Sequence, residues 1–400
     1  MRIALVAGEQ SGDGLAAALI GALRALHPDA EFIGMTGPQM RAAGCRSLGD
    51  IDELSLMGLV EVLRHLPRLL RLRRRLVRDI LAARPDVFVG IDAAEFNLSL
   101  ARRFKARGLA TVQYVSPQVW AWRQGRVRSI ARDCDLVLCL LPFEPGFYRE
   151  HAVHAEFVGH PFADQIPLQS DRVAARAALG LPASGKVVAL LPGSRRAEVQ
   201  SLGADFLGAA RWLAEREPGL NFVAPMANAR VQARFEAQWQ VLGGAAAPSA
   251  GRGPSATAPL SLRIVPGHAR EALAAADVAL VASGTATLEA LLCGTPLVVA
   301  YRLSPLTAWL LRTLRLVRLQ NFSLPNLLAG ERLVPEFFQE QAQPATLGAA
   351  LRDWLAAPGR CALLRQRFAA IHQQLRTGGA GLAAAAISRL LAQRARGSAT

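Results

Sequence analysis

Short apolar runs recur along the chain and alternate with longer stretches of helical periodicity. The runs rich in Val, Ile and Leu are 2–7, 86–91, 111–115, 136–141, 187–191, 221–225, 262–265, 278–282 and 297–301. Most of them are continuous rather than alternating in polarity, which is typical of strands covered on both faces. Strands that alternate with helices in this way predict parallel sheets joined by right-handed crossovers.

The strand–helix pattern begins twice, at Ile3 and again near Val187. Because 400 residues exceed the usual size of one domain, we expect an α/β fold with two doubly wound, Rossmann-like domains facing a cleft. The C-terminal tail is helical and either packs back on the N-terminal domain or is exchanged with a partner chain. The predicted parts are an N-terminal domain at 1–165, a C-terminal domain at 166–345 and a helical segment at 346–400.

Composition excludes several classes of protein. Hydrophobic residues make up 52% and charged residues 19% of the chain, which argues against global disorder. The five cysteines are scattered without a CxxC pair, so neither a disulfide framework nor a zinc site is expected. We find no signal peptide and no uncharged apolar run of roughly 18 residues that would span a membrane. The stretch 243–261 reads as a flexible surface insertion without a function of its own.

The chain carries a net charge of +15, almost all of it from arginine. A coding bias towards Arg and Ala explains such an excess, and so does attraction to anionic lipid or a phosphorylated substrate. The stretch 54–78 has an apolar face flanked by arginines, as in an interfacial helix, and 309–318 is similar. An ordinary domain helix with a basic solvent face is the alternative. The candidate membrane contacts are Leu63, Leu66, Leu69, Leu70, Arg71, Arg73 and Arg74.

The first turn of chemical interest, at 7–14, reads Ala-Gly-Glu-Gln-Ser-Gly-Asp-Gly and leads from a strand into a helix. Its glycines permit close approach of a ligand, but their spacing is not that of the GxGxxG dinucleotide motif. Its two acidic side chains would repel a pyrophosphate and suit sugar hydroxyls better. A purely structural turn is the alternative. The acceptor or cleft candidates are Gly8, Glu9, Ser11, Gly12 and Asp13.

The second turn, at 90–97, places Asp92 just after an apolar strand. A carboxylate there can accept a proton from a hydroxyl nucleophile if it is ionised and within hydrogen-bond reach. Asp92 is therefore the candidate catalytic base, and the alternative is that it only caps the following helix. We assign no catalytic role to Glu95.

Two further turns suit an anionic nucleotide. At 191–199, Ser194 is a plausible N-cap and Arg195 offers a planar fork to phosphate oxygens beside helix N–H groups. At 282–296, small hydroxylic residues at a helix N-terminus can hold a diphosphate, and Glu289 either accepts hydrogen bonds from ribose hydroxyls or is a surface glutamate. The donor-site candidates from these turns are Gly193, Ser194, Arg195, Ser283, Gly284, Thr285 and Glu289.

Other chemistries are not supported. The seven histidines are dispersed, and no Asp-x-Asp or other metal-ligand spacing occurs, so we expect neither a metal nor a cofactor. A basic protein that binds nucleic acid is also disfavoured, because aromatic residues are only 6% of the chain and no nucleic-acid motif is present.

The four turns resemble those of the lipid-A-disaccharide synthase family. The resemblance extends to Tyr-Val-Ser-Pro-Gln-Val-Trp-Ala-Trp-Arg at 114–123 and Ser-Leu-Pro-Asn-Leu-Leu-Ala-Gly at 323–330, and it covers nearly the whole chain in the same order. This chain departs from the family pattern at Ala94 and Glu95, where Pro and Asp are expected.

The resemblance implies a GT-B glycosyltransferase that is peripheral to the inner membrane on the cytoplasmic side. Such enzymes transfer 2,3-diacylglucosamine from UDP to the 6-hydroxyl of 2,3-diacylglucosamine 1-phosphate, with inversion. The resemblance also favours Asp92 as the general base, Arg195 and Glu289 as nucleotide ligands and Asn326 as a site residue, and it allows a homodimer. Another UDP-sugar transferase or a UDP-sugar 2-epimerase on the same architecture is the nearest alternative.

Overall fold

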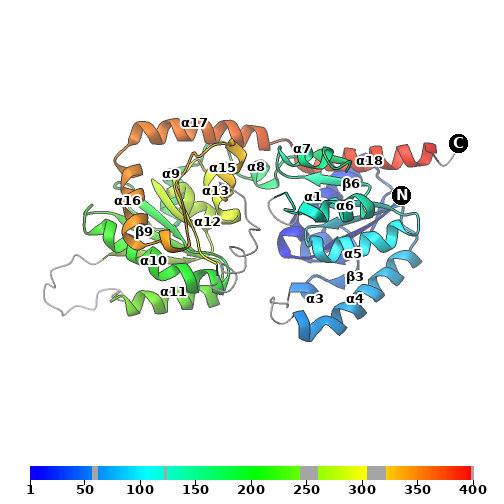
Figure 1. Cartoon of the computed structure of the whole chain (residues 1–400), viewed down its shortest axis with the longest axis horizontal. Coiled ribbons are helices and arrows are strands. Elements are labelled where there is room, and N and C mark those ends of the chain that lie inside the picture. Colours follow the sequence, from blue (N-terminus) through cyan, green and yellow to red (C-terminus); the bar gives the residue numbers. More distant parts are fainter. Residues whose placement is uncertain (56–61, 121–123, 244–259, 304–320, 398–400) are drawn as a thin grey trace. The chain divides into compact units, whose positions relative to one another are not determined.

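The computed structural model describes residues 1–55, 62–120, 124–243, 260–303 and 321–397. Most of the predicted insertion at 243–261, and all of the basic stretch at 309–318, lie outside these residues. The chain forms two compact units, one of Met1–Asp164 with Leu375–Thr400 and the other of Gln165–Gln374. Each unit contains one parallel sheet and its helices (Figure 1), so the predicted α/β class with two parallel-sheet domains is confirmed.

The first unit has a seven-stranded sheet in the order β3-β2-β1-β4-β5-β6-β7. All neighbouring strands pair in parallel. The strands are β1 (Arg2–Ala7), β2 (Glu31–Thr36), β3 (Arg46–Asp50), β4 (Val87–Ile91), β5 (Ala110–Tyr114), β6 (Leu136–Cys139) and β7 (Ala155–Phe157). The helices are α1 (Gln10–Leu26), α2 (Pro38–Ala42), α3 (Asp52–Ser55), α4 (Val62–Ala82), α5 (Ala94–Lys105), α6 (Val127–Asp133), α7 (Glu144–Arg149), α8 (Pro161–Gln165) and α18 (Gly379–Gly397), with a 3-10 turn at Gln124–Arg126.

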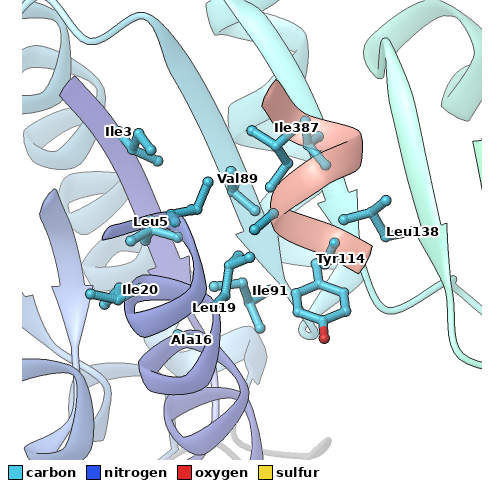
Figure 2. Close-up of a cluster of buried hydrophobic side chains, with 14 of the residues drawn as sticks. Ile3, Leu5, Ala16, Leu19, Ile20, Val89, Ile91, Tyr114, Leu138 and Ile387 are labelled. Atoms are coloured by element: carbon cyan, nitrogen blue, oxygen red, sulfur yellow. The ribbon is translucent and has the colours of Figure 1, made fainter. Parts of the chain in front are cut away.

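Alternation along β1 explains why both faces of this sheet are covered. Ile3 and Leu5 point into a cluster with α1 and with Ile387 of α18 (Figure 2). The intervening side chains of β1 point into a second cluster with α4 and α5. Each fully buried Ile or Leu contributes about 1.5–3 kcal/mol, so α18 is held on this unit by burial of its apolar face.

The second unit has a six-stranded parallel sheet in the order β10-β9-β8-β11-β12-β13. Its helix α10 packs against α11 and α16, and α12 packs against α9. The strands are β8 (Val187–Leu191), β9 (Asn221–Met226), β10 (Ser261–Pro266), β11 (Val278–Ala282), β12 (Leu297–Tyr301) and β13 (Glu336–Phe338). The helices are α9 (Arg172–Ala178), α10 (Arg196–Ala214), α11 (Ala229–Val241), α12 (Ala269–Ala275), α13 (Thr285–Leu292), α15 (Leu324–Ala329), α16 (Pro344–Leu355) and α17 (Pro358–Leu375), with a 3-10 turn at Gln339–Gln341.

All nine predicted strands are present, with ends that differ by at most two residues. Four strands were missed: β2, β3, β7 and β13. β3 lies at a sheet edge with a polar sequence and little burial, while β7 and β13 span only three residues each. The segment predicted as one helical unit at 346–400 is divided in the structure, because α16 and most of α17 lie in the second unit.

No helix within the described ranges is both long and apolar enough to cross a membrane.

Candidate active site

The turns at 7–14 and 90–97 lie next to each other in the first unit. Strands β1 and β4 are neighbours in register, with Ala7 opposite Ile91, so their carboxyl ends meet at one edge of the sheet. A Cβ added at Gly12 would lie 3.7 Å from the Cβ of Asp92. At Gly8 it would overlap the methyl group of Ala93. Gly8 therefore allows the two turns to pack together, whereas at Gly12 a Cβ would make only ordinary van der Waals contacts.

The backbone at Asp92 is strained. Asp92 has a φ of 53° and Ala93 a φ of 36°, both in the left-handed region, which costs roughly 1–2 kcal/mol for each residue that carries a Cβ. Strain of this kind clusters at functional sites, where the surrounding structure maintains it. The turn after β4 is thus a strong candidate for chemistry.

The carboxylate of Asp92 is half-buried and makes no hydrogen bond or ion pair with the described part of the chain. Ala93, not Asp92, occupies the N-cap of α5, and no side chain caps that helix. The alternative in which Asp92 merely caps the helix is therefore wrong. Its carboxylate is free to accept a proton from a ligand.

The remaining candidates of the first turn divide into two groups. Glu9 and Ser11 are exposed and available to a ligand. Asp13 is only 1% exposed, and its carboxylate accepts three backbone N–H groups at the start of α2, from Gly37 (3.0 Å), Gln39 (2.8 Å) and Met40 (3.0 Å). Asp13 thus anchors the segment after β2, and its oxygens are not directed at a sugar.

Glu95 forms an ion pair with Arg126, whose guanidinium donates to both carboxylate oxygens. The Glu95 side chain is 72% exposed. An exposed, paired carboxylate is poorly suited to act as a base, which agrees with the absence of a catalytic assignment.

The two turns predicted to bind the nucleotide are likewise neighbours in the second unit, because Leu191 of β8 lies opposite Val281 of β11. Arg195 is the N-cap of α10, where Ser194 was expected. Its guanidinium lies 3.6 Å from a Glu198 oxygen. Because the Arg195 side chain is 81% exposed, it can still reach a ligand. The Glu198 carboxylate accepts the backbone N–H groups of Ser194 (2.9 Å) and Arg195 (3.2 Å). Two N–H groups expected to hold an anion are therefore already engaged.

The helix α13 begins more openly. Its N-cap Gly284 and first residue Thr285 are exposed, while the Ser283 hydroxyl donates to the Phe322 carbonyl (3.3 Å). This contact joins the 282–296 turn to the segment before α15. Glu289 is paired with Arg270 through an Nε–Oε1 contact of 3.0 Å, so one of its oxygens is engaged within the protein.

Asn326 has a structural environment. It is fully buried, and its amide donates to the carbonyl of Val334 (2.9 Å) and to Glu336 (2.8 Å). Its side-chain oxygen accepts the N–H groups of Leu333 and Val334. Buried Glu336 also accepts from the backbone of Phe322 and Ser323. Asn326 therefore fixes the loop between α15 and β13, and α15 itself packs against α13.

A buried carboxylate in the first unit was not singled out from the sequence. Glu144 is 2% exposed and accepts from Trp120 Nε1 (3.0 Å) and from the backbone of Leu141 (3.0 Å). Burial raises its pKa to about 7, although hydrogen bonds from Leu141, Ser116 and Trp120 partly offset the shift. Glu144 thus holds the indole of Trp120 in place.

A second missed feature is a cluster of three half-buried rings in the second unit. Tyr301 lies 6.2 Å from Phe322 and from Phe338, measured between ring centroids. Burial raises the pKa of Tyr301, and the negative charge of Glu198 raises it further. The cluster therefore lies close to the turn that carries Arg195. Only the fold reveals it, because it joins the ends of β12 and β13 with the segment before α15.

The C-terminal half of α4 packs as a domain helix. Leu72, Leu76 and Ile80 are buried against the sheet, and Arg75 pairs with Glu53 at 2.8 Å. Leu69 and Leu70 are half-buried, Arg71 and Arg74 are exposed, and Arg73 is partly buried. The side chains of Leu63 and Leu66 lie outside the described part. For 72–80 this favours the alternative, a domain helix with a basic outer face.

The described ranges contain no group of three His, Cys, Asp or Glu side chains arranged to hold a metal ion.

Comparison with known proteins gives the family. The lipid-A-disaccharide synthetase family model matches residues 3–377. The lipid-A-disaccharide synthase of Alkalilimnicola ehrlichii is 55% identical over 390 residues, covering 97% of this chain and 98% of that protein.

Solved structures show the fold alone. The kitacinnamycin glycotransferase has a TM-score of 0.62 at 17% identity and covers 97% of this chain and 98% of its own. The UDP-GlcNAc 2-epimerase of Neisseria meningitidis bound to UDP-GlcNAc has a TM-score of 0.61 at 12% identity, covering 98% of this chain and 100% of its own. Two parallel-sheet units with carboxyl-edge turns, a GT-B fold and the full-length match together establish that the chain belongs to the lipid-A-disaccharide synthetase family of glycosyltransferases.

Proposed function

We propose that the chain is a lipid-A-disaccharide synthase. It transfers 2,3-diacylglucosamine from UDP to the 6-hydroxyl of 2,3-diacylglucosamine 1-phosphate, and the products are a β-1,6-linked disaccharide 1-phosphate and UDP. The observation that carries the proposal is the free Asp92 carboxylate on a strained turn, in a chain that matches the family along almost its whole length.

The reaction follows as a direct displacement with inversion. The acceptor 6-hydroxyl oxygen bonds to the anomeric carbon, the bond from that carbon to the UDP oxygen breaks, and Asp92 takes the hydroxyl proton. Arg195, with its exposed guanidinium, stabilises the charge that develops on UDP, together with the N-terminus of α13. The binding residues of both sugars hold the reacting atoms in line.

Product formation tests the proposal. Purified protein receives both acylated substrates, with and without EDTA, and mass spectrometry follows the product. We expect the tetra-acyl disaccharide 1-phosphate in both samples. Product only without EDTA would show that the leaving group needs a metal. If no disaccharide forms while UDP binding is intact, a different acceptor or the 2-epimerase reaction replaces the proposal.

We further propose that the enzyme acts at the cytoplasmic face of the inner membrane, with α4 against anionic headgroups. Exposed Arg71 and Arg74 support this, because each basic residue near an anionic surface contributes about 1 kcal/mol. Arg71→Ser with Arg74→Ser is expected to reduce binding to anionic vesicles, whereas Arg216→Ser, at an exposed position of the second unit, leaves it unchanged. Equal binding by both variants would refute a role for α4.

A homodimer remains a prediction of the same resemblance. Light scattering of the purified protein measures it directly: a mass twice that of the 42.8 kDa chain supports the dimer, and the monomer mass excludes it.

A further inference from the structure

Two buried amide side chains converge on the backbone of the turn that carries Asp92. Asn97 lies in the first turn of α5 and is fully buried, and Gln113 lies in β5 and is 1% exposed. The Asn97 amide donates to the Asp92 carbonyl at 2.9 Å. The Gln113 amide donates to the same carbonyl at 3.1 Å. One carbonyl oxygen thus receives hydrogen bonds from two different elements.

The same two amides extend to the neighbouring strand ends. Asn97 Nδ2 also lies 3.2 Å from the carbonyl of Val6, one residue before the end of β1, and 3.2 Å from that of Ile91, which ends β4. Gln113 Nε2 also contacts the carbonyl of Val115 (3.3 Å). Val115 is a β-branched residue with a φ of 75°, a conformation such residues rarely adopt. The amides therefore bridge the strained positions at the ends of β4 and β5.

The orientation of the Asn97 amide is fixed by these contacts. Turning it over would place its oxygen against three carbonyl oxygens. In the observed orientation Asn97 Oδ1 is buried without a hydrogen-bond partner in the described part of the chain. A buried unpaired oxygen costs free energy. The hydrogen bonds that Nδ2 of Asn97 donates must therefore stabilise this orientation by more than the unpaired oxygen costs.

Gly90 makes room for both side chains. A Cβ at this position would lie 2.6 Å from the Cβ of Asn97 and 3.1 Å from Oε1 of Gln113. Gly90, two positions before Asp92 in β4, therefore leaves the space that the two amide side chains occupy.

We propose that Asn97 and Gln113 are positioning residues that fix the Asp92 turn through its carbonyl oxygen and so place the carboxylate for proton transfer. The proposal rests on Asp92 being the base of the proposed transferase. Since the Asp92 carboxylate has no partner in the described part of the chain, its position depends on its own backbone. That backbone is held from α5 and from β5 by these amides. Neither amide is required to touch a substrate.

Steady-state kinetics of Asn97→Ala and Gln113→Leu test this role. Each variant removes one side-chain amide donor and leaves residues 92 and 93 of the turn unchanged. We expect kcat to fall about 10-fold to 100-fold, as for a small misplacement of a reacting group, with KM for both substrates nearly unchanged. The matched control is Thr111→Val, because Thr111 is also fully buried in β5 but its hydroxyl bonds to Asp133 and Asp135. This control is expected to lose stability without losing kcat.

Melting curves and circular dichroism first establish that each variant is folded at the assay temperature. If Asn97→Ala does not fold, Gln113→Leu alone decides, with Gly90→Ala as a second way to displace both amides. Unchanged kcat in the folded variants, or a rise in KM alone, would overturn the positioning role.

The Asp92→Ala variant separates this inference from the proposed function. If Asp92→Ala is inactive while the two amide variants are fully active, only the positioning role is lost. If Asp92→Ala keeps normal turnover, the assignment of the base itself is wrong. When the assignment of the base and the positioning role are both correct, adding Gln113→Leu to Asp92→Ala should not lower the residual rate further, because no carboxylate remains to be placed.

Discussion

The contact between Gly8 and Ala93 makes a sharp prediction about the site in the first unit. In Gly8→Ala, the new Cβ would lie closer to the Ala93 Cβ than the 3.0 Å below which real Cβ atoms are essentially never found. Neither atom belongs to a flexible side chain that could move aside. The two turns must therefore separate, and the Asp92 backbone moves with Ala93.

The magnitude follows from ordinary contact distances. Carbon atoms pack well at roughly 3.5–4 Å, so full relief of this overlap requires the turns to separate by roughly 1.5–2 Å. Overpacking of this kind costs about 1–3 kcal/mol of stability. A displacement of roughly 1 Å at a reacting group can lower a rate by a factor on the order of 100. We therefore expect Gly8→Ala to fold with a lower melting temperature and to lose most of its kcat.

The assay combines thermal melting with kcat, and a second substitution provides the rescue. In Gly8→Ala with Ala93→Gly, the nearest remaining atom is the Cα of residue 93 at 3.5 Å, an ordinary contact, and glycine suits the φ of 36° there. This pair should recover most of the activity. Gly21→Ala is the matched control, because a Cβ there meets nothing within 4 Å. Full activity in Gly8→Ala, or a folded but inactive pair, would refute the packing of the two turns.

Three further predictions concern other parts of the structure. Glu144→Gln is expected to change how the free energy of unfolding depends on pH. Burial raises the Glu144 pKa from 4.5 to about 7. The stability that protonated Glu144 contributes is therefore complete below pH 4.5 and is lost as the pH rises to 7. The free energy of unfolding of wild type relative to Glu144→Gln should fall by roughly 3 kcal/mol over that window. Denaturant titrations that give the two proteins the same pH dependence of this free energy would contradict the prediction. Asn326→Ala leaves buried partners unpaired and should lower stability by about 1–3 kcal/mol, and an unchanged melting temperature would show that the loop does not depend on it. Arg195→Ala should weaken UDP binding about 10-fold with an unchanged melting temperature, because its side chain is 81% exposed and charge-assisted bonds to phosphate contribute about 1.5–3 kcal/mol; equal calorimetric affinity would remove it from the donor site.

Most of the fold was predictable because long continuous apolar runs mark buried parallel strands. The strand β2 was missed although five of its six residues are buried, because Gly34 and Thr36 interrupt its apolar run. All nine long runs form strands. The edge strand β3 and the three-residue strands β7 and β13 carry too little buried sequence for such a pattern. Nor does the apolar pattern show that α16 stays with the second unit while α18 packs on the first, because both helices bury an apolar face.

The candidate site was predictable in position but not in the roles of single residues. The turns after β1 and β4 were predicted to carry the chemistry, and the structure places these strand ends side by side. Asp13 and Asn326 look like ligand-binding side chains in the sequence, yet their partners are backbone groups distant along the chain. The residue type alone does not tell whether a carboxylate or an amide binds a loop of the protein or a sugar. The reverse holds for Glu144, whose partners Ser116, Trp120 and Leu141 come from loop segments that only the fold brings together.

The most direct test of proton transfer at the Asp92 turn is the turnover of Asp92→Asn, which keeps the size of the side chain but removes the base. Calorimetric titration with the UDP donor accompanies the rate measurement. We predict that kcat falls by a factor on the order of 10²–10⁴ while donor affinity and melting temperature stay close to those of the wild type. Turnover within about twofold of the wild type would contradict Asp92 as the base, and parallel loss of donor binding and turnover would make the residue structural.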